Sequence, residues 1–271
     1  MRNIRLTVEY DGTAFHGWQR QSRVRTVQGD LEAALSVILR EPIAVRGAGR
    51  TDAGVHALGQ VANFRTESDL SLERIERGVN ALTKADLAVR DAREADEQFD
   101  ARMWACGRHY LYLLLAQPSS LWNERAYRPR RWPDLGRMNA TAAHFAGDHD
   151  FSEFSCASDD EPGVRARVFY ARWEPWDRGA MFRIGAVRFL YKMVRCVVAA
   201  CLQAGQGAID SADIEARLAA PAHRGRAVAP ARGLHLLAVD YPAGKPDFEA
   251  LRRGREGAAG GFDCLPPKAV L

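Results

Sequence analysis

The chain has few cysteines and no long apolar run, and these two absences exclude several classes of protein. The five cysteines are odd in number and form no C-x-x-C pair, which argues against a disulfide framework and a zinc knuckle. No run of about 18 apolar residues occurs, so no membrane-spanning helix is predicted. The first ten residues, MRNIRLTVEY, alternate apolar and polar side chains. We therefore expect a soluble, unexported, cytoplasmic protein with no membrane partner.

Lysine is also scarce. Only four of the 38 basic residues are lysines, and the other 34 are arginines. Arginine offers a planar fork that binds phosphates and stacks on bases, so this bias suits an RNA partner. A GC-rich genome that encodes arginine in place of lysine explains the same composition equally well. Composition alone leaves the two explanations open.

The pattern of apolar residues predicts alternating strands and helices. Strands are expected at 4–10, 43–47, 59–66, 87–94 and 108–117, as two strands within 165–190, and at 234–242. Helices are expected from Val27 to before Pro42, with Thr26 as N-cap, and at 72–82, 135–147, about 190–204 and from Ser211.

This order predicts an α+β fold of two ferredoxin-like, RRM-like halves, each with an antiparallel sheet and helices packed on one face. The predicted halves are residues 1–105 and residues 106–242. The segment 243–271 is rich in glycine and proline and has no period, so we expect a flexible tail there.

One acidic residue, Asp52, stands in a glycine-rich loop, GAGRTDAGVHALGQ, two residues after Arg50. A phosphate-binding G-x-G-x-x-G pattern fails because Asp52 occupies the position of its third glycine. A metal site lacks ligands, since the nearest acids in sequence are Glu41 and Glu67.

Of the three chemical interpretations, a lone ionised carboxylate that acts as a nucleophile or a base suits the loop best, although most Gly-Asp loops are simple turns. Glycines at 47, 49 and 54 permit tight turns and close approach to a substrate, and a nearby cation favours the charged form of an acid. A surface turn with Asx capping remains the alternative on local spacing alone.

Two basic clusters with interleaved aromatic residues are candidates for RNA binding, because arginines bind phosphates and aromatic rings contact bases. The alternative for each is a solvated loop. The first cluster lies in FHGWQRQSRVR and the second in NERAYRPRRW; the candidate residues are Arg20, Arg23, Arg25, Arg128 and Arg130. His144 and His149 favour a turn after a helix over a metal site, since no third ligand is apparent.

Seven blocks of the sequence resemble, in the same order, those of the tRNA pseudouridine synthase A family. The resemblance runs from about residue 3 to residue 242. The blocks are YDGTAFHGWQRQ (10–21), TVQGDLEAAL (26–35), GRTDAGVHALGQVANF (49–64), FDARMWACGRHYLYLL (99–114), GDHDFSEF (147–154), FLYKMVRCVV (189–198) and APARGLHLLAVDYP (229–242).

The resemblance implies an isomerase that converts uridine to pseudouridine in the anticodon stem-loop of tRNA, without metal or organic cofactor, and that works as a homodimer. It implies that Asp52 is the catalytic residue and that Arg195 pairs with it. It further implies that Arg50 helps to hold the extruded nucleotide and that Tyr110 stacks on the target base. The sequence departs from the family near Arg195, where Lys192 replaces a usual His and Cys196 a usual small polar residue.

Residue chemistry agrees with these roles. A base within a stem cannot expose its glycosidic bond, so the enzyme must flip it into a pocket and replace its lost stacking with an aromatic face. Tyr110 and Tyr112 share one face of a predicted strand, so either could offer a ring. A carboxylate can attack C1′ or remove a ribose proton, and the sequence does not choose between them.

Two other functions compete with the isomerase. A catalytically silent RNA-binding protein of the same fold is the first, and the intact set of Asp52, Arg50, Tyr110 and Arg195 speaks against it. A metal-dependent RNA hydrolase is the second, and the missing ligand cluster disfavours it.

Overall fold

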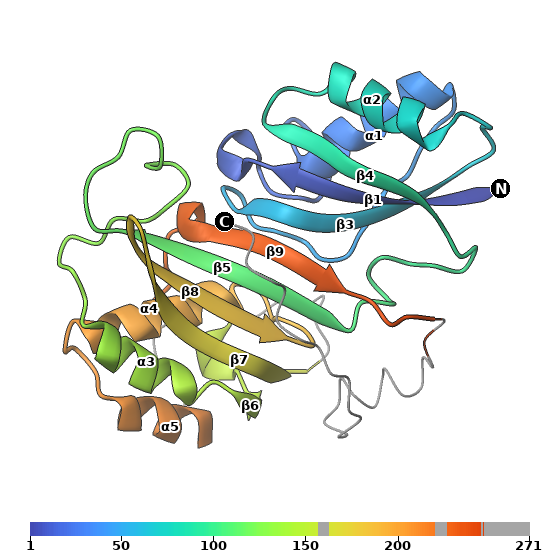
Figure 1. Ribbon diagram of the computed structural model, residues 1–271. Coiled ribbons are helices and arrows are strands. Elements are labelled where there is room, and N and C mark those ends of the chain that lie inside the picture. Colours follow the sequence, from blue (N-terminus) through green and yellow to red (C-terminus); the bar gives the residue numbers. More distant parts are fainter. Residues whose placement is uncertain (157–162, 220–226, 245, 247–271) are drawn as a thin grey trace. The chain divides into compact units, whose positions relative to one another are not determined.

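The computed structural model describes residues 1–156, 163–219, 227–244 and 246. Contacts divide the chain into two units, one formed by residues 1–105 and the strand from His235, the other by residues 106–234. Both units combine helices with strands, mostly antiparallel, which confirms the predicted α+β class (Figure 1). The predicted tail, 243–271, lies almost entirely outside the described residues.

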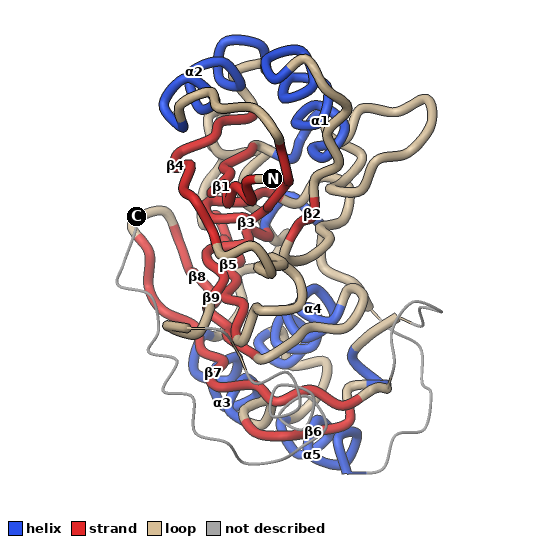
Figure 2. The backbone as a smooth tube through the Cα atoms, turned by 90° about the vertical axis from the view of Figure 1, so that its right-hand side faces the viewer, coloured by secondary structure: helices blue, strands red, loops and turns tan. Residues whose placement is uncertain are grey.

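The sheet of the first unit is built around β3. Its strands are β1 (Arg2–Tyr10), β2 (Arg46–Gly47), β3 (His56–Thr66), β4 (Leu87–Ala95) and β9 (Leu234–Asp240). β1 pairs antiparallel with β3 and β4, β2 pairs antiparallel with β3, and β9 adds a short parallel pairing to β3. Figure 2 shows β4, β1, β3 and β2 side by side in that order. Ile4 lies opposite Phe64 and Leu6 opposite Ala62, and all four are buried.

Two helices cover this sheet from the same side (Figure 1). They are α1 (Val27–Leu39) and α2 (Leu72–Leu82), and a short 3-10 turn, η1 (Gly12–Ala14), follows β1. Thr26 caps α1 as predicted, since its side chain accepts a hydrogen bond from the N–H of Gly29. Leu31, Leu35 and Val79 are fully buried and form part of the core of this unit, whereas Leu82, which we expect on the apolar face of α2, is 54% exposed.

The strand predicted at 43–47 is mostly wrong. Only Arg46 and Gly47 pair with β3. The backbone N–H of Val45 donates to Oε1 of Glu32, and that of Ile43 donates to Oγ of Ser36. Side chains of α1 therefore satisfy these N–H groups, while Ile43 and Val45 stay buried as a strand pattern would require.

The strands of the second unit pair antiparallel in the order β5-β8-β7-β6. The strands are β5 (Gly107–Leu115), β6 (Gly147–Asp150), β7 (Arg165–Trp176) and β8 (Gly179–Ala186), and residues 177–178 form the turn between β7 and β8. The helices are α3 (Leu135–Ala143), α4 (Met193–Gly205) and α5 (Ser211–Ala219), with 3-10 turns η2 (Ser152–Phe154) and η3 (Ala231–Gly233). The apolar helix α4 is buried along nearly its whole length.

In the first unit the chain runs β-α-β-β-α-β, which is the order of a ferredoxin-like domain. The prediction of two such halves remains a prediction. Among the helices that the structure describes, none combines the length and the apolar character that crossing a bilayer requires.

Candidate active site

Asp52 lies in the loop between β2 and β3, where the backbone is held at several points. The N–H of Trp18 donates to the carbonyl of Thr51 at 3.0 Å, and the N–H of Val55 donates to the carbonyl of Asp52 at 3.2 Å. The buried hydroxyls of Tyr10 and Thr51 lie 2.8 Å apart. Asp52 itself is half-buried and Arg50 is exposed. The structure thus presents the carboxylate on a braced loop instead of a free surface turn.

Glycines in two segments make this bracing possible. A Cβ at Gly17 would lie 2.6 Å from the carbonyl oxygen of Thr51, and one at Gly12 would lie 2.1 Å from that of Val55. Gly17 and Gly54 also have positive φ angles, 87° and 75°, which side chains rarely adopt. The block that contains Gly12 and Gly17 therefore packs its backbone directly onto the Asp52 loop.

The role expected of Gly47 needs correction. A Cβ at Gly47 would lie 2.5 Å from the Trp18 ring, so this glycine makes room for a core tryptophan and not for a substrate. Nothing lies within 4 Å of a Cβ at Gly49. Of these two glycines, only Gly49 leaves open space beside the backbone.

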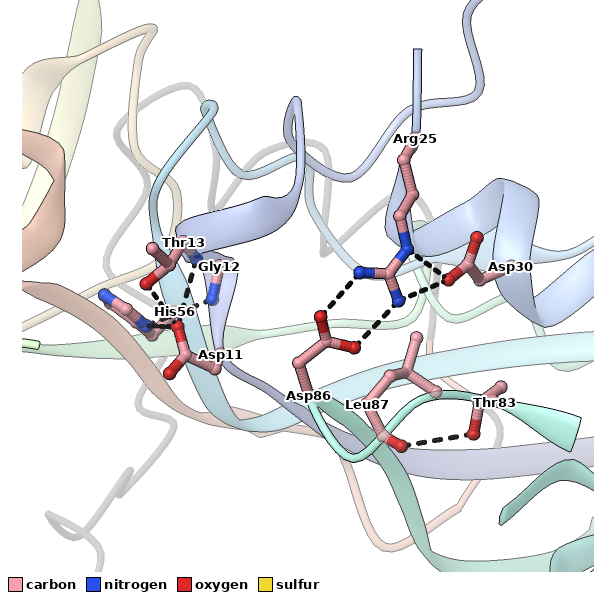
Figure 3. A network of polar contacts seen from close by, with 9 residues as sticks. All are labelled: Asp11, Gly12, Thr13, Arg25, Asp30, His56, Thr83, Asp86 and Leu87. Atoms are coloured by element: carbon pink, nitrogen blue, oxygen red, sulfur yellow. Dashed lines mark hydrogen bonds and ion pairs between the residues drawn. The ribbon is translucent and has the colours of Figure 1, made fainter. Parts of the chain in front are cut away.

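A pair of buried histidines anchors the end of the loop, and Figure 3 shows one of them, His56, beside Asp11 and Gly12. The N–H of Gly12 donates to Nδ1 of His56 at 3.0 Å, and Oδ1 of Asp11 lies 3.2 Å from the same nitrogen. The ring of His56 stacks on that of His235 on β9, with centroids 4.6 Å apart. Sequence reasoning missed this pair, although a histidine stands in each of two family-like blocks, GRTDAGVHALGQ and GLHLLAVDYP.

Arg25, a predicted RNA contact, is engaged inside the first unit. Its guanidinium donates to both carboxylate oxygens of Asp86, at 2.5 and 2.7 Å, and to Asp30 at 2.8 Å (Figure 3). It also lies 4.1 Å from the centre of the Phe15 ring. The hydrogen bonds from Arg25 lower the pKa of Asp86. These contacts tie the segment before α1 to the segment before β4.

The other two arginines of the first basic cluster differ from Arg25. Nη1 of Arg20 lies 3.2 Å from Oε2 of Glu32, yet the Arg20 side chain is 70% exposed. Arg23 is exposed on a left-handed backbone with a φ of 73°. Both cations are accessible to a polyanion.

Tyr110 and Tyr112 lie on β5 in the second unit, and the structure separates their roles. Tyr112 is fully buried, and its hydroxyl donates to the carbonyl of Pro230 at 2.9 Å. Burial raises its pKa well above the usual value. Tyr110 is half-buried, with the Phe189 ring edge-on at 5.1 Å. Of the two, only Tyr110 has a ring with a partly accessible surface.

Arg195 lies in the first turn of α4 and is half-buried. Its Nε donates to the carbonyl of Ala229 at 2.8 Å, while the N–H of Ala229 donates to the carbonyl of Arg195 at 3.0 Å. Lys192 precedes the helix in a left-handed conformation with a φ of 59°. The reciprocal bonds to Ala229 fix both the backbone and the side chain of Arg195.

The second basic cluster lies between β5 and α3. Arg128 and Arg130 are exposed. In the same unit His144 is the C-cap of α3, but the turn predicted at His149 is wrong, since His149 lies on β6 with its Nε2 2.8 Å from the carbonyl oxygen of Ala146. Within the described ranges, no three His, Cys, Asp or Glu side chains are grouped as a metal site.

A family model described as tRNA pseudouridine synthase matches residues 6–102 and 141–242. The match defines the class of the protein, a pseudouridine synthase, which is an isomerase. The tRNA pseudouridine synthase A of Chlorobium luteolum is 46% identical over 244 residues, covering 89% of this chain and 96% of that protein. Those of Chlorobaculum tepidum and Acetivibrio thermocellus are 42% and 39% identical, again over 89% of this chain and over 98% and 100% of theirs. The chain belongs to the tRNA pseudouridine synthase A family.

Proposed function

We propose that this enzyme converts uridine to pseudouridine in the anticodon stem-loop of tRNA, with Asp52 as the catalytic residue. The observation that carries the proposal is the half-buried carboxylate of Asp52 on a loop braced by Tyr10 and Trp18. The reaction breaks the C1′–N1 bond and joins C1′ to C5 of the same uracil, so it needs a group that acts on the sugar while the base rotates. A positioned carboxylate does this by attack on C1′ or by removal of a ribose proton.

The target base leaves the stem before this chemistry takes place. Flipping a nucleotide costs a few kcal/mol of stacking and pairing, which the pocket must offset. We assign the stacking contact to Tyr110, because its ring is partly accessible whereas Tyr112 is fully buried and bonded to Pro230. Arg50 is exposed two residues before Asp52, where its guanidinium can bind the phosphate of the extruded nucleotide.

Arg195 acts with Asp52 in this account. Its Nε donates to the carbonyl of Ala229. The two terminal nitrogens of the guanidinium are therefore the donors that we assign to the carboxylate of Asp52. Arg195→Lys keeps the charge but loses this orientation, so we expect kcat to fall at least tenfold. A double-mutant cycle of Arg195→Lys and Asp52→Asn, measured on the free energy of unfolding, tests the pairing, because paired residues are non-additive whereas independent ones add.

The broader tRNA contacts include Arg20, Arg23, Arg128 and Arg130, all of which are exposed. Arg25 serves the fold instead, through Asp30 and Asp86. We further propose that the enzyme is a homodimer and that both units follow a ferredoxin-like plan. Sedimentation of the purified protein across a range of concentrations tests the dimer.

The experiment that tests the function is pseudouridine mapping in unmodified tRNA incubated with the protein in EDTA. Pseudouridine confined to the anticodon stem-loop supports the proposal. Tight tRNA binding without any product would favour a silent RNA-binding protein. Product that forms only without the chelator would contradict the metal-free reaction.

A further inference from the structure

The loop between β5 and α3 and the turn between β7 and β8 form one surface of the second unit. The N–H of Ala116 donates to the carbonyl of Arg178 in the turn at 2.9 Å. Tyr127 exchanges two backbone hydrogen bonds with β5, to Leu113 and from Leu115, each 2.9 Å long. The loop is therefore attached to the sheet at several points and holds its side chains in place.

Trp132 stands out on this surface because it is large, aromatic and 42% exposed. Among the described residues, only Tyr191, at 40%, exposes a Phe, Tyr or Trp ring to a similar extent. Trp132 rests against Gly179, where an added Cβ would lie 3.0 Å from Cη2 of the indole. Gly179 has a φ of 155°, and that Cβ would also lie 2.3 Å from the carbonyl oxygen of Leu114. The backbone thus supports an indole that remains partly exposed to solvent.

More aromatic and cationic groups adjoin the same turn. Trp122 and Trp176 meet edge to face at 5.2 Å, and the guanidinium of Arg178 lies 5.8 Å from the centre of the Trp122 ring. Besides the hydrogen bond from Ala116 to Arg178, this aromatic packing is a second contact between the β5–α3 loop and the β7–β8 hairpin.

The loop that carries Trp132 is predominantly basic, although Asp134 and, in the neighbouring turn, Asp177 are also exposed. Arg128, Arg130 and Arg131 are all exposed, and no carboxylate of the described residues lies within ion-pair distance of them. The nearby Asp134 caps α3 by accepting from the N–H of Arg137 at 2.9 Å. Three unpaired cations within four residues repel a second basic surface and attract a polyanion.

We propose that Trp132 stacks on an unpaired nucleotide of the tRNA away from the target uridine, while Arg128, Arg130 and Arg131 bind the flanking phosphates. An exposed indole supplies the sequence-tolerant stacking that single-stranded RNA uses, and adjacent arginines supply the salt-dependent contacts. The inference rests on the proposed function for the identity of the RNA. It assigns a contact that serves binding, not chemistry.

The test compares Trp132→Ala with Trp132→Phe and with Leu121→Ala as the matched control. Leu121 is 73% exposed in the same loop but has no aromatic face. Loss of one base stack weakens binding about tenfold, so we expect the dissociation constant and KM for tRNA to rise by that factor in Trp132→Ala. Trp132→Phe recovers most of the affinity, and Leu121→Ala stays within twofold of the wild type. Thermal unfolding of each variant shows that it folds.

Equal tRNA affinity in Trp132→Ala and the wild type would overturn the inference. So would a change of oligomeric state in Trp132→Ala that accounts for the lost affinity, because the surface would then contact a second copy. Failure of the proposed function is distinguishable: the wild type would bind tRNA but form no pseudouridine. The comparison of Trp132 variants by binding would still be decisive in that case.

Discussion

The hydroxyl of Tyr10 lies 2.8 Å from Oγ1 of Thr51, the residue immediately before Asp52. Both groups are buried, and the carbonyl of Thr51 also accepts from the N–H of Trp18. A residue at the end of β1 therefore sets the position of the loop that carries the carboxylate. Because a shift of about 1 Å can slow a reaction a hundredfold, this contact matters for rate as well as for stability.

Tyr10→Phe removes the hydrogen bond but keeps the ring. We expect about 1 kcal/mol loss of unfolding free energy and a fall in kcat of about tenfold, with tRNA affinity nearly unchanged. Tyr241→Phe is the matched control, since the hydroxyl of Tyr241 donates to Ala101 at 2.7 Å, away from the loop. If both variants lost stability but neither lost kcat, Tyr10 would have no part in positioning Asp52.

The Arg25–Asp86 ion pair predicts a specific acid sensitivity. Arg25 lowers the pKa of Asp86 in the folded state, so the pair stabilises fully above the unfolded value, near 4, and is lost as the pH falls through the folded value. Asp86→Asn should cost about 2 kcal/mol at neutral pH and flatten the loss of stability below about pH 4.

Chemical denaturation at several pH values measures this effect. Asp177→Asn is the control, because Asp177 is 67% exposed and lies 3.7 Å from Arg178. Its pH profile should follow that of the wild type. If the free energy of unfolding of Asp86→Asn were lower at every pH by the same amount, and fell as steeply in acid as that of the wild type, the lowered pKa of Asp86 would not cause the acid sensitivity.

Arg40 ends α1 in a left-handed conformation, with a φ of 57°. The left-handed conformation destabilises a residue with a side chain by about 1–2 kcal/mol. Glycine avoids most of this steric cost but loses more conformational entropy on folding. Arg40→Gly should therefore raise the unfolding free energy by about 0.5–1 kcal/mol, and Arg40→Ala should not. Equal stability of the two variants would show that the left-handed backbone is not strained.

Salt dependence separates the RNA-binding arginines from the structural ones. Arg23→Gln and Arg130→Gln should each weaken tRNA binding and reduce the salt slope by about one unit per lost phosphate contact. Arg90→Gln is a suitable control, because Arg90 is exposed but pairs with Glu9. A slope as steep as that of the wild type would mean that Arg23 and Arg130 remain in solvent.

The regular elements could be predicted where local rules decide them. Thr26 caps α1 as expected, and the apolar spacing of α4 matches its buried residues, while in α2 only Ile75 and Val79 are buried. The strand at 43–47 could not be excluded from the sequence, because its alternation is that of a strand. Only the structure shows that the side chains of Glu32 and Ser36 accept hydrogen bonds from the backbone N–H groups in this segment.

The sequence predicts which residues belong to the candidate site, but it does not predict the contacts that hold them in place. The resemblance points to Asp52, Arg50, Tyr110 and Arg195, whose roles stay predictions. It does not reveal that Gly47 serves Trp18 or that His56 stacks on His235, since these contacts join distant segments. The sequence predicts Arg25 as an RNA contact, because its ion-pair partner Asp86 lies 61 residues away along the chain.

Single-turnover formation of pseudouridine by Asp52→Asn, with tRNA binding measured on the same samples, tests the central claim most directly. Asparagine keeps the size of the side chain but can neither attack C1′ nor accept a ribose proton. We predict no detectable product with tRNA affinity within a few-fold of the wild type, since a carboxylate contributes little to binding a polyanion. Product at a rate near that of the wild type, or tRNA affinity that falls in step with activity, would contradict the catalytic role of Asp52.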